Sequence, residues 1–218
     1  IKIGISTTLT EEFLLPYLEK FHKLYPKIEI QIYTNIADEI FPKLREGLID
    51  LMIVNLPCEE FNDIEIKIVK EIQDCFVVNE YYFELINKRM TLNDLNSYAL
   101  ILQAKGANTR RFIDNFALKN NVILKPNMAL ASYKLVVEFA KIGFGIGYAT
   151  KEYIKYDLKN KKLFELDIEP KIPSRNIGLA YSKKNLPSFS TKKLIEIILK
   201  DTNWTEPQKL DSLLIKGL

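Results

Sequence analysis

Apolar and polar positions follow a strand-and-helix rhythm over the first 55 residues. A short apolar run at 2–6 and a strict alternation at 28–33 predict two strands. The apolar run at 50–54 predicts a third strand that is covered on both faces. Between these strands, apolar residues recur at helical spacing over 14–25 and 36–46. Such successive units predict a parallel sheet with helices on both faces.

The ends of the two helices carry their own signals. The stretch from Thr8 to Glu11 fits a capping box, which predicts that the first helix begins there. The Tyr25-Pro26 pair predicts the end of that helix, because the residue before a proline is biased away from helical geometry. For the second helix, Asn35 is the expected N-cap and Gly47 marks the end.

The pattern then restarts and predicts a second α/β lobe inserted into the first. Strands are predicted at 75–78, 98–102, 128–131, 146–149 and 176–181, and helices at 109–119, 132–142 and 191–199. We therefore divide the chain into a first lobe at 1–72 plus 179–204, a second lobe at 73–178, and a C-terminal tail at 205–218. Because the chain crosses between the lobes twice, we expect a hinge at the crossings.

Composition and charge narrow the class of protein. The chain has 218 residues, 47% of them hydrophobic, and no apolar run approaches the roughly 20 residues of a membrane span. A net charge of +3 is too small to predict that this segment itself binds nucleic acid. We expect a cytoplasmic protein without membrane contact.

Residues 1–72 carry 8 basic and 13 acidic side chains, a net of −5, whereas 73–178 carry 16 and 11, a net of +5. The difference in net charge either reflects a chance distribution of charged residues or indicates that lobes of opposite sign attract each other across a dimer.

Candidate catalytic and metal-binding residues are few. His22 lies inside a predicted helix, far from any strand end, and is expected to be a surface residue. Cys58 and Cys75 have no nearby Cys or His partner, so we expect reduced structural thiols and no metal. The glycine-rich stretch 143–147 lacks the spacing of a dinucleotide-binding loop. We therefore predict no catalytic residue, no cofactor and no enzymatic activity.

Small, neutral, hydrogen-bonding residues gather at the predicted strand ends. They are Ser6 to Thr8, Thr34-Asn35, Asn55, Gln103 to Thr109, and Ser132-Tyr133. Ligands bind beyond the carboxyl ends of strands in open α/β sheets, and helix N-termini favour anions. A small anion such as a carboxylate would suit this arrangement. For any single residue, plain helix capping is an equally good interpretation.

Several stretches, in order and at matching spacing, resemble the effector-binding domain of LysR-type transcriptional regulators over about residues 1–200. They are Ile3-Gly-Ile-Ser6, Leu14-Leu-Pro-Tyr-Leu18 with Phe21 and Tyr25-Pro26, Leu44-Arg-Glu-Gly47 with Ile49-Asp50-Leu51, and Val136-Val137 with Gly143-Phe-Gly145-Ile146. The resemblance implies an α/β fold of two Rossmann-like lobes with a hinge, like type 2 periplasmic binding proteins. It implies ligand-binding roles for Ser6, Thr7, Thr8, Asn35, Asn55, Gln103, Ser132 and Tyr133.

The same resemblance implies partners. A small, carboxylated effector would bind between the lobes and control promoter DNA binding by a winged helix-turn-helix domain upstream of Ile1. Two copies would pair antiparallel, as a homodimer or, in the full-length protein, a tetramer. We expect the helices 14–25 and 109–119 to meet there, with apolar contacts from Leu14, Leu18 and Phe112, and Arg110, Arg111 and Lys119 facing Glu11, Glu12 and Glu19.

Two other classes remain open. A solute-binding protein of a transport system would share the fold but would need a signal peptide upstream. A prephenate-dehydratase-like enzyme would carry a Thr-Arg-Phe motif, which the extra arginine in Asn108-Thr-Arg-Arg-Phe112 interrupts.

Overall fold

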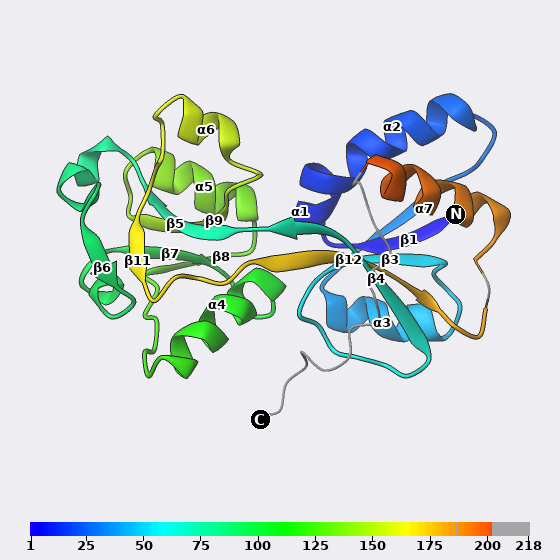
Figure 1. The fold of residues 1–218 in the computed structure, drawn as a ribbon, viewed down its shortest axis with the longest axis horizontal. Coiled ribbons are helices and arrows are strands. Elements are labelled where there is room, and N and C mark those ends of the chain that lie inside the picture. Colours follow the sequence, from blue (N-terminus) through cyan, green and yellow to red (C-terminus); the bar gives the residue numbers. More distant parts are fainter. Residues whose placement is uncertain (186, 202–218) are drawn as a thin grey trace.

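The protein has two lobes lying side by side, each built on a five-stranded sheet (Figure 1). The structure is a computed structural model and describes residues 1–185 and 187–201. We call the first sheet with its helices lobe I and the second sheet with its helices lobe II. The mixed α/β architecture agrees with the fold class expected from the strand-and-helix pattern.

Lobe I contains the first three predicted strands and their helices. Its sheet has the order β2-β1-β3-β12-β4, formed by β1 (Lys2–Ile5), β2 (Gln31–Thr34), β3 (Leu51–Asn55), β4 (Ile64–Ile72) and β12 (Arg175–Ser182). Its helices are α1 (Thr7–Leu9), a π-helical segment (Thr10–Leu14), α2 (Leu15–Leu24), α3 (Ala37–Arg45) and α7 (Phe189–Asp201). As predicted, β1, β2 and β3 are parallel, whereas β12 is antiparallel to both of its neighbours.

Lobe II repeats this layered arrangement. Its sheet has the order β10-β5-β9-β7-β8, formed by β5 (Asp74–Val78), β7 (Leu100–Gln103), β8 (Met128–Leu130), β9 (Ile146–Thr150) and β10 (Phe164–Glu165). Its helices are α4 (Asn108–Lys119), α5 (Tyr133–Lys141) and α6 (Lys155–Lys159), with 3-10 turns at Glu80–Leu85 and Asp94–Ser97. A two-stranded sheet joins β6 (Arg89–Thr91) to β11 (Asp167–Glu169).

Each sheet is apolar on both faces because helices cover both. In β3, Leu51 and Ile53 pack into the cluster under α2 and α7, whereas Met52 and Val54 pack into the cluster over α3. Successive strand residues point to opposite faces, so a fully apolar run is what a doubly covered strand requires. In the same way, α4 covers one face of the lobe II sheet and α5 covers the other.

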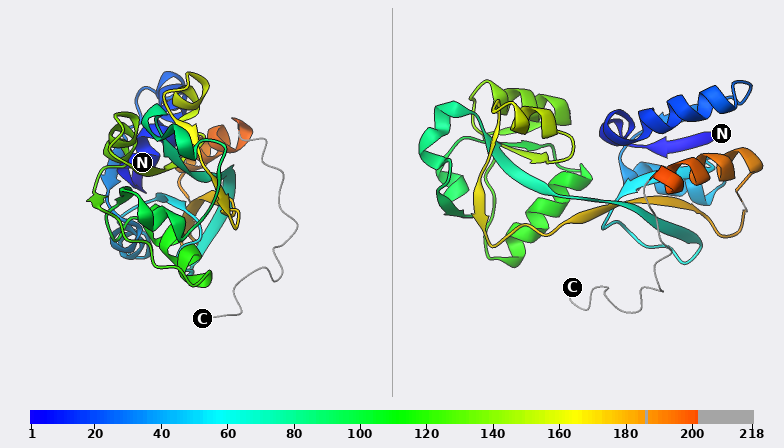
Figure 2. Two further views of the ribbon diagram at one scale, coloured as in Figure 1. Left: turned by 90° about the vertical axis from the view of Figure 1, so that its left-hand side faces the viewer. Right: turned by 45° about the horizontal axis from the view of Figure 1, so that its top comes forward.

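Two strands carry the chain between the lobes (Figure 2). The first crossing runs from β4 into β5 with Gln73 between them, and the second enters β12 at Arg175. The sequence pattern missed β4, although Ile64, Ile66 and Ile68 alternate there. The lobe boundaries predicted at 72/73 and 178/179 stay predictions, and the 205–218 tail lies outside the described residues.

The first helix begins differently from the prediction. The capping box at Thr8 to Glu11 is wrong, because Ser6 is the N-cap and its Oγ accepts a hydrogen bond from the Leu9 amide at 3.3 Å. The chain enters the helix directly after β1, so Ser6 already caps it before the capping-box residues are reached. Asn35 is also not the N-cap of α3. That position belongs to Ile36, whose amide donates to Asn35 Oδ1 at 2.8 Å.

The expected dimer contacts need correction. Leu14 is fully buried in the core of its own lobe. Arg110 is also buried, and its guanidinium pairs with Asp114 of the same helix at 2.8 Å. Arg111 pairs with Asp38 of the same chain at 3.2 Å. Neither Leu14 nor Arg110 can therefore face a second copy.

Within 1–185 and 187–201, no helix is long and apolar enough to cross a membrane.

Candidate ligand-binding site

A cavity of about 320 Å³ opens where strand ends and helix starts of both lobes meet. Its polar lining comes from Ser6, Thr7, Thr8, Thr34, Asn35, Asn55, Gln103, Asn108 and Thr109. The other lining residues, from both lobes, are alanine, leucine, isoleucine, valine and methionine. Every described lining side chain is therefore uncharged.

Lobe I supplies one wall through the carboxyl ends of β1 and β3. Ser6 follows β1 directly and caps the helix, which leaves Thr7 and Thr8 on its first turn at the cavity. Asn55 is the last residue of β3 and is 8% exposed. Gly4 allows α3 to approach this wall, since a Cβ there would lie 2.3 Å from Ile40 Cγ2.

Lobe II supplies the opposite wall through β7 and the start of α4. Gln103 ends β7 and is 8% exposed. The chain then turns into α4, whose first two residues, Asn108 and Thr109, both line the cavity. In each lobe, the carboxyl ends of the parallel strands lie at one edge of the sheet, and in both lobes this edge borders the cavity. The polar groups of the two walls therefore face one another across it.

Two helix N-termini at the cavity have no side-chain cap. The N-cap of α3 is Ile36 and that of α4 is Ala107, and neither offers an oxygen to the first-turn amides. Both residues line the cavity. The positive ends of two helix dipoles, one from each lobe, therefore act on a space with neutral walls. Such a space favours an anion.

Asn55 has unused hydrogen-bonding capacity. Its Oδ1 is buried and has no hydrogen-bond partner among the described residues. A buried amide oxygen in that state costs free energy unless a water or a ligand donates to it. The cavity therefore offers a hydrogen-bond acceptor at Asn55 Oδ1, in addition to the donor N–H groups at the helix starts.

Asn108 joins the two lobes beside the cavity. Its Nδ2 donates to the backbone oxygen of Asn55 at 3.1 Å and to that of Pro57 at 3.0 Å. Both acceptors belong to lobe I, whereas Asn108 begins α4 of lobe II. The side chain thus holds the two walls at their present separation.

Comparison with known protein families matches residues 1–203 to the LysR substrate binding domain. The chain belongs to this family. Among related proteins, the HTH-type transcriptional regulator CysL of Bacillus subtilis is 24% identical over 182 residues, 84% of this chain. The chain spans only 60% of the length of CysL.

Solved structures of LysR-type regulatory domains share the fold. The CcmR regulatory domain of Synechocystis, solved in complex with 2-PG, superimposes with a TM-score of 0.81 at 21% identity, over 93% of this chain and 96% of that one. The effector-binding domain of QuiR, solved in complex with shikimate, gives 0.76 at 21% identity, over 93% and 96%. The two-lobed fold expected from the sequence is therefore confirmed, as is the resemblance to LysR-type regulators.

In this LysR substrate binding domain, six of the eight predicted ligand-binding residues line one cavity. They are Ser6, Thr7, Thr8, Asn35, Asn55 and Gln103. Their role in binding stays a prediction. The cavity also brings in Asn108 and Thr109, which lie within the strand-end stretch 103–109.

Ser132 and Tyr133 are not part of the cavity lining, where Ala131 stands instead. Ser132 caps α5 through its Oγ, which accepts from the Leu135 amide at 3.4 Å. Tyr133 is 6% exposed, and its hydroxyl oxygen accepts from the Thr150 amide at 3.0 Å. Burial raises the pKa of Tyr133 well above its usual value, which keeps the phenol neutral. In the described structure, both residues support lobe II.

No local sequence pattern indicated the buried ion pair next to this site. Arg175 pairs with Asp74 inside the LysR substrate binding domain, and its Nη2 also contacts Thr109 Oγ1 at 3.2 Å. The available signal was the presence of one charged residue at the start of each of two apolar strands. Charged residues in such places are nearly always paired.

Proposed function

We propose that this LysR substrate-binding domain senses a small carboxylated metabolite, which binds in the cavity between the lobes. The observation that carries the proposal is a neutral, hydrogen-bonding lining that receives two uncapped helix N-termini from opposite lobes. Helix N-termini bind carboxylates through their free amides without a basic side chain. The structurally similar CcmR and QuiR domains, solved in complex with 2-PG and with shikimate, support a small-molecule effector.

The lining also limits the chemistry of the effector. Asn55, Gln103 and the threonine hydroxyls are suited to partners that both donate and accept hydrogen bonds. Hydroxy- and amino-carboxylates have such groups beside their charge, and a cavity of about 320 Å³ limits them to a small size. The proposed effector is therefore a compact, polar carboxylate.

Thermal denaturation with a panel of hydroxy- and amino-carboxylates, including shikimate, tests the proposal. A ligand at about 100 times its Kd stabilises the domain by about 2.7 kcal/mol. Thr8→Trp fills the cavity and should abolish that gain, whereas Ser132→Ala lies outside the lining and should keep it. If no carboxylate stabilises the wild type, or if Thr8→Trp responds equally, the cavity is not the effector site.

We further propose that the effector controls promoter DNA binding by an upstream winged helix-turn-helix domain in a cytoplasmic protein that is not an enzyme. The relatives named as HTH-type transcriptional regulators support this over a transport protein. The described lining holds no acid, base or thiol that could move a proton or attack a substrate. Reading the gene upstream of Ile1 separates these classes, and a prephenate turnover assay tests the enzyme alternative.

We also propose an antiparallel homodimer in which α2 of one copy meets the α4 region of the other. Exposed apolar side chains support this pairing. They are Leu15 and Leu24 on α2, Ile32 and Tyr33 on β2, Leu118 on α4, and Ile123 beyond it. β2 and β8 are each an edge strand of their own sheet. These residues replace Leu14 and Arg110 as the expected contacts.

A further inference from the structure

A second cavity, of about 550 Å³, lies between α3 of lobe I and α4 of lobe II. These helices lie on the same side of the two sheets, the lower side in Figure 1. The second cavity shares Ala37 and Asn108 with the first, and the remainder of its lining is different. The two cavities are thus neighbours, and Asn108, which is hydrogen-bonded to lobe I, lines both.

We propose that this second cavity is a binding site for an aromatic anion, such as an aromatic carboxylate or sulfonate. Three aromatic rings form its walls: Phe41 from lobe I, and Phe112 and Phe116 from lobe II. Pro57, Cys58 and Pro173 extend the apolar surface. Small-molecule sites of about 300–1,000 Å³ typically combine such a lining with a few polar groups.

The aromatic walls are held in place by their surroundings. Phe41 is 2% exposed, and its ring packs against that of Phe61 with centroids 5.0 Å apart. The Phe112 ring lies 5.8 Å from the guanidinium carbon of Arg175. Because these contacts fix the rings without a ligand, the cavity is largely preformed and binding orders few side chains.

The charge preference comes from α4. Arg111, Asn115 and Lys119 follow one another at four-residue spacing and all border the cavity, beside Phe112 and Phe116. Arg111 is neutralised by Asp38 through two contacts of 3.2 Å. Lys119 has no ion-pair partner within the described ranges, so its ammonium group is available to an anion at this end of the cavity.

Glu59 borders the opposite wall and is the group that would favour a cation instead. It lies next to Glu60 on the loop after β3, whereas the helical row offers both the charge of Lys119 and the amide of Asn115. An anion lying along α4 gains both contacts. The cavity has walls from both lobes, so an occupant also stabilises their present separation.

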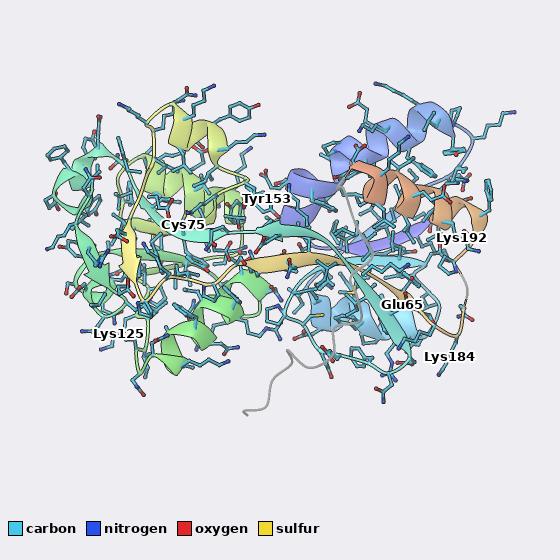
Figure 3. The ribbon with its side chains drawn as sticks, viewed as in Figure 1. Glu65, Cys75, Lys125, Tyr153, Lys184 and Lys192 are labelled. Carbon is cyan, nitrogen blue, oxygen red and sulfur yellow. The ribbon has the colours of Figure 1, made fainter. Side chains whose placement is uncertain are left out.

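Fluorescence titration with 8-anilinonaphthalene-1-sulfonate, an aromatic sulfonate, tests the site in the wild-type domain. N-phenyl-1-naphthylamine, which has the same rings without the charge, is the neutral comparison. Lys119→Glu should raise the Kd of the sulfonate about tenfold, as expected for the loss of about 1.4 kcal/mol. The Kd of the neutral probe should stay nearly unchanged. Lys125→Glu is the matched control, since Lys125 lies on lobe II away from lobe I (Figure 3).

Ring removal provides an independent measurement. Phe116→Ser should weaken both probes at least about tenfold, whereas Phe144→Ser, at an exposed turn, should weaken neither. Thr8→Trp should leave both probes bound, which separates this site from the effector cavity. The proposal is overturned if Lys119→Glu and Lys125→Glu have equal effects, if the neutral probe loses affinity equally, or if Thr8→Trp displaces the sulfonate.

Discussion

Arg175 and Asp74 form a buried ion pair at the place where the chain passes between the lobes. Their side chains are 1% and 0% exposed, and Arg175 Nη2 lies 3.1 Å from Asp74 Oδ1. Thr150 and Tyr148 donate further hydrogen bonds to the carboxylate at 2.6 and 3.1 Å. Burial by itself lowers the pKa of Arg175, but the charge of Asp74 raises it above its usual value, so the guanidinium stays protonated. The pair joins both crossings.

Arg175→Met should strongly destabilise the domain, because it leaves the Asp74 carboxylate buried without its partner. Losing one member of a buried pair typically costs about 3–5 kcal/mol. Urea denaturation measures the free energy of unfolding. Arg89→Met is the control, since the Arg89–Asp167 pair is exposed, and its effect should be close to nil. If adding Asp74→Leu to Arg175→Met recovers no stability, the cost does not come from the unpaired charge.

Asn55→Leu should separate stability from binding. The substitution has similar volume and removes a buried Oδ1 that has no partner in the described structure, so the unfolding free energy should stay constant or rise by about 1 kcal/mol. Any carboxylate that stabilises the wild type should lose that effect in the variant. Thermal denaturation with and without the carboxylate measures both quantities. Lower stability without ligand together with unchanged binding would show that Asn55 serves the fold.

Cys58 should react slowly with thiol reagents despite being partly accessible. Burial, and then the charges of Glu60 and Glu59, raise the pKa of the Cys58 thiol to about 12. At pH 8 the thiolate is therefore scarce, and the reaction should be slower than that of a free cysteine by on the order of a thousandfold. The rate of reaction with Ellman's reagent should rise about tenfold per pH unit from 8 to 10. Cys75→Ala should leave this rate unchanged, since Cys75 is 3% exposed. Fast labelling at pH 7 would contradict the expectation.

Charged substitutions on the proposed dimer surface should yield monomers. Leu15 is 51% exposed on α2 and Ile123 is 68% exposed beyond α4, so glutamate at either position leaves the core intact. In sedimentation velocity, Leu15→Glu and Ile123→Glu should each shift a wild-type dimer to monomer, because charge is poorly tolerated in an apolar interface. Phe83→Glu, at a side chain that is 78% exposed outside this surface, should remain dimeric. A wild type that is monomeric at high concentration would rule out the dimer.

Most of the architecture could be predicted because each sheet needs helices on both faces. A strand covered on both faces needs an apolar run, as at 51–54, and a covering helix needs apolar residues at helical spacing, as in α4. Both patterns can be recognised in the sequence. The residue at which a helix begins was harder to predict, because several residues near a strand end can serve as the N-cap. Ser6 was one such residue, and it took the role assigned to the pattern from Thr8 to Glu11.

The candidate site was predictable only in part, and for a physical reason. Strand ends lie at one edge of a sheet, which brought Asn55 and Gln103 to the same cavity. The direction of a side chain depends on tertiary packing, so Tyr133 points into the core of lobe II although it follows a strand end. The contact between Asn108 and Asn55 depends on how the two lobes meet, which no local pattern encodes.

The ion pair between Asp74 and Arg175 has a consequence for protein engineering. The segment that builds lobe II leaves lobe I and returns to it at residues in direct contact, so both of its ends are at one place. A segment with adjoining ends can be exchanged without stretching its host. Lobe II could therefore be grafted from one LysR-type regulator into another as a cassette cut at these two residues. Chimeras that keep the Asp–Arg junction would allow each half of an effector cavity to be assigned its own share of specificity.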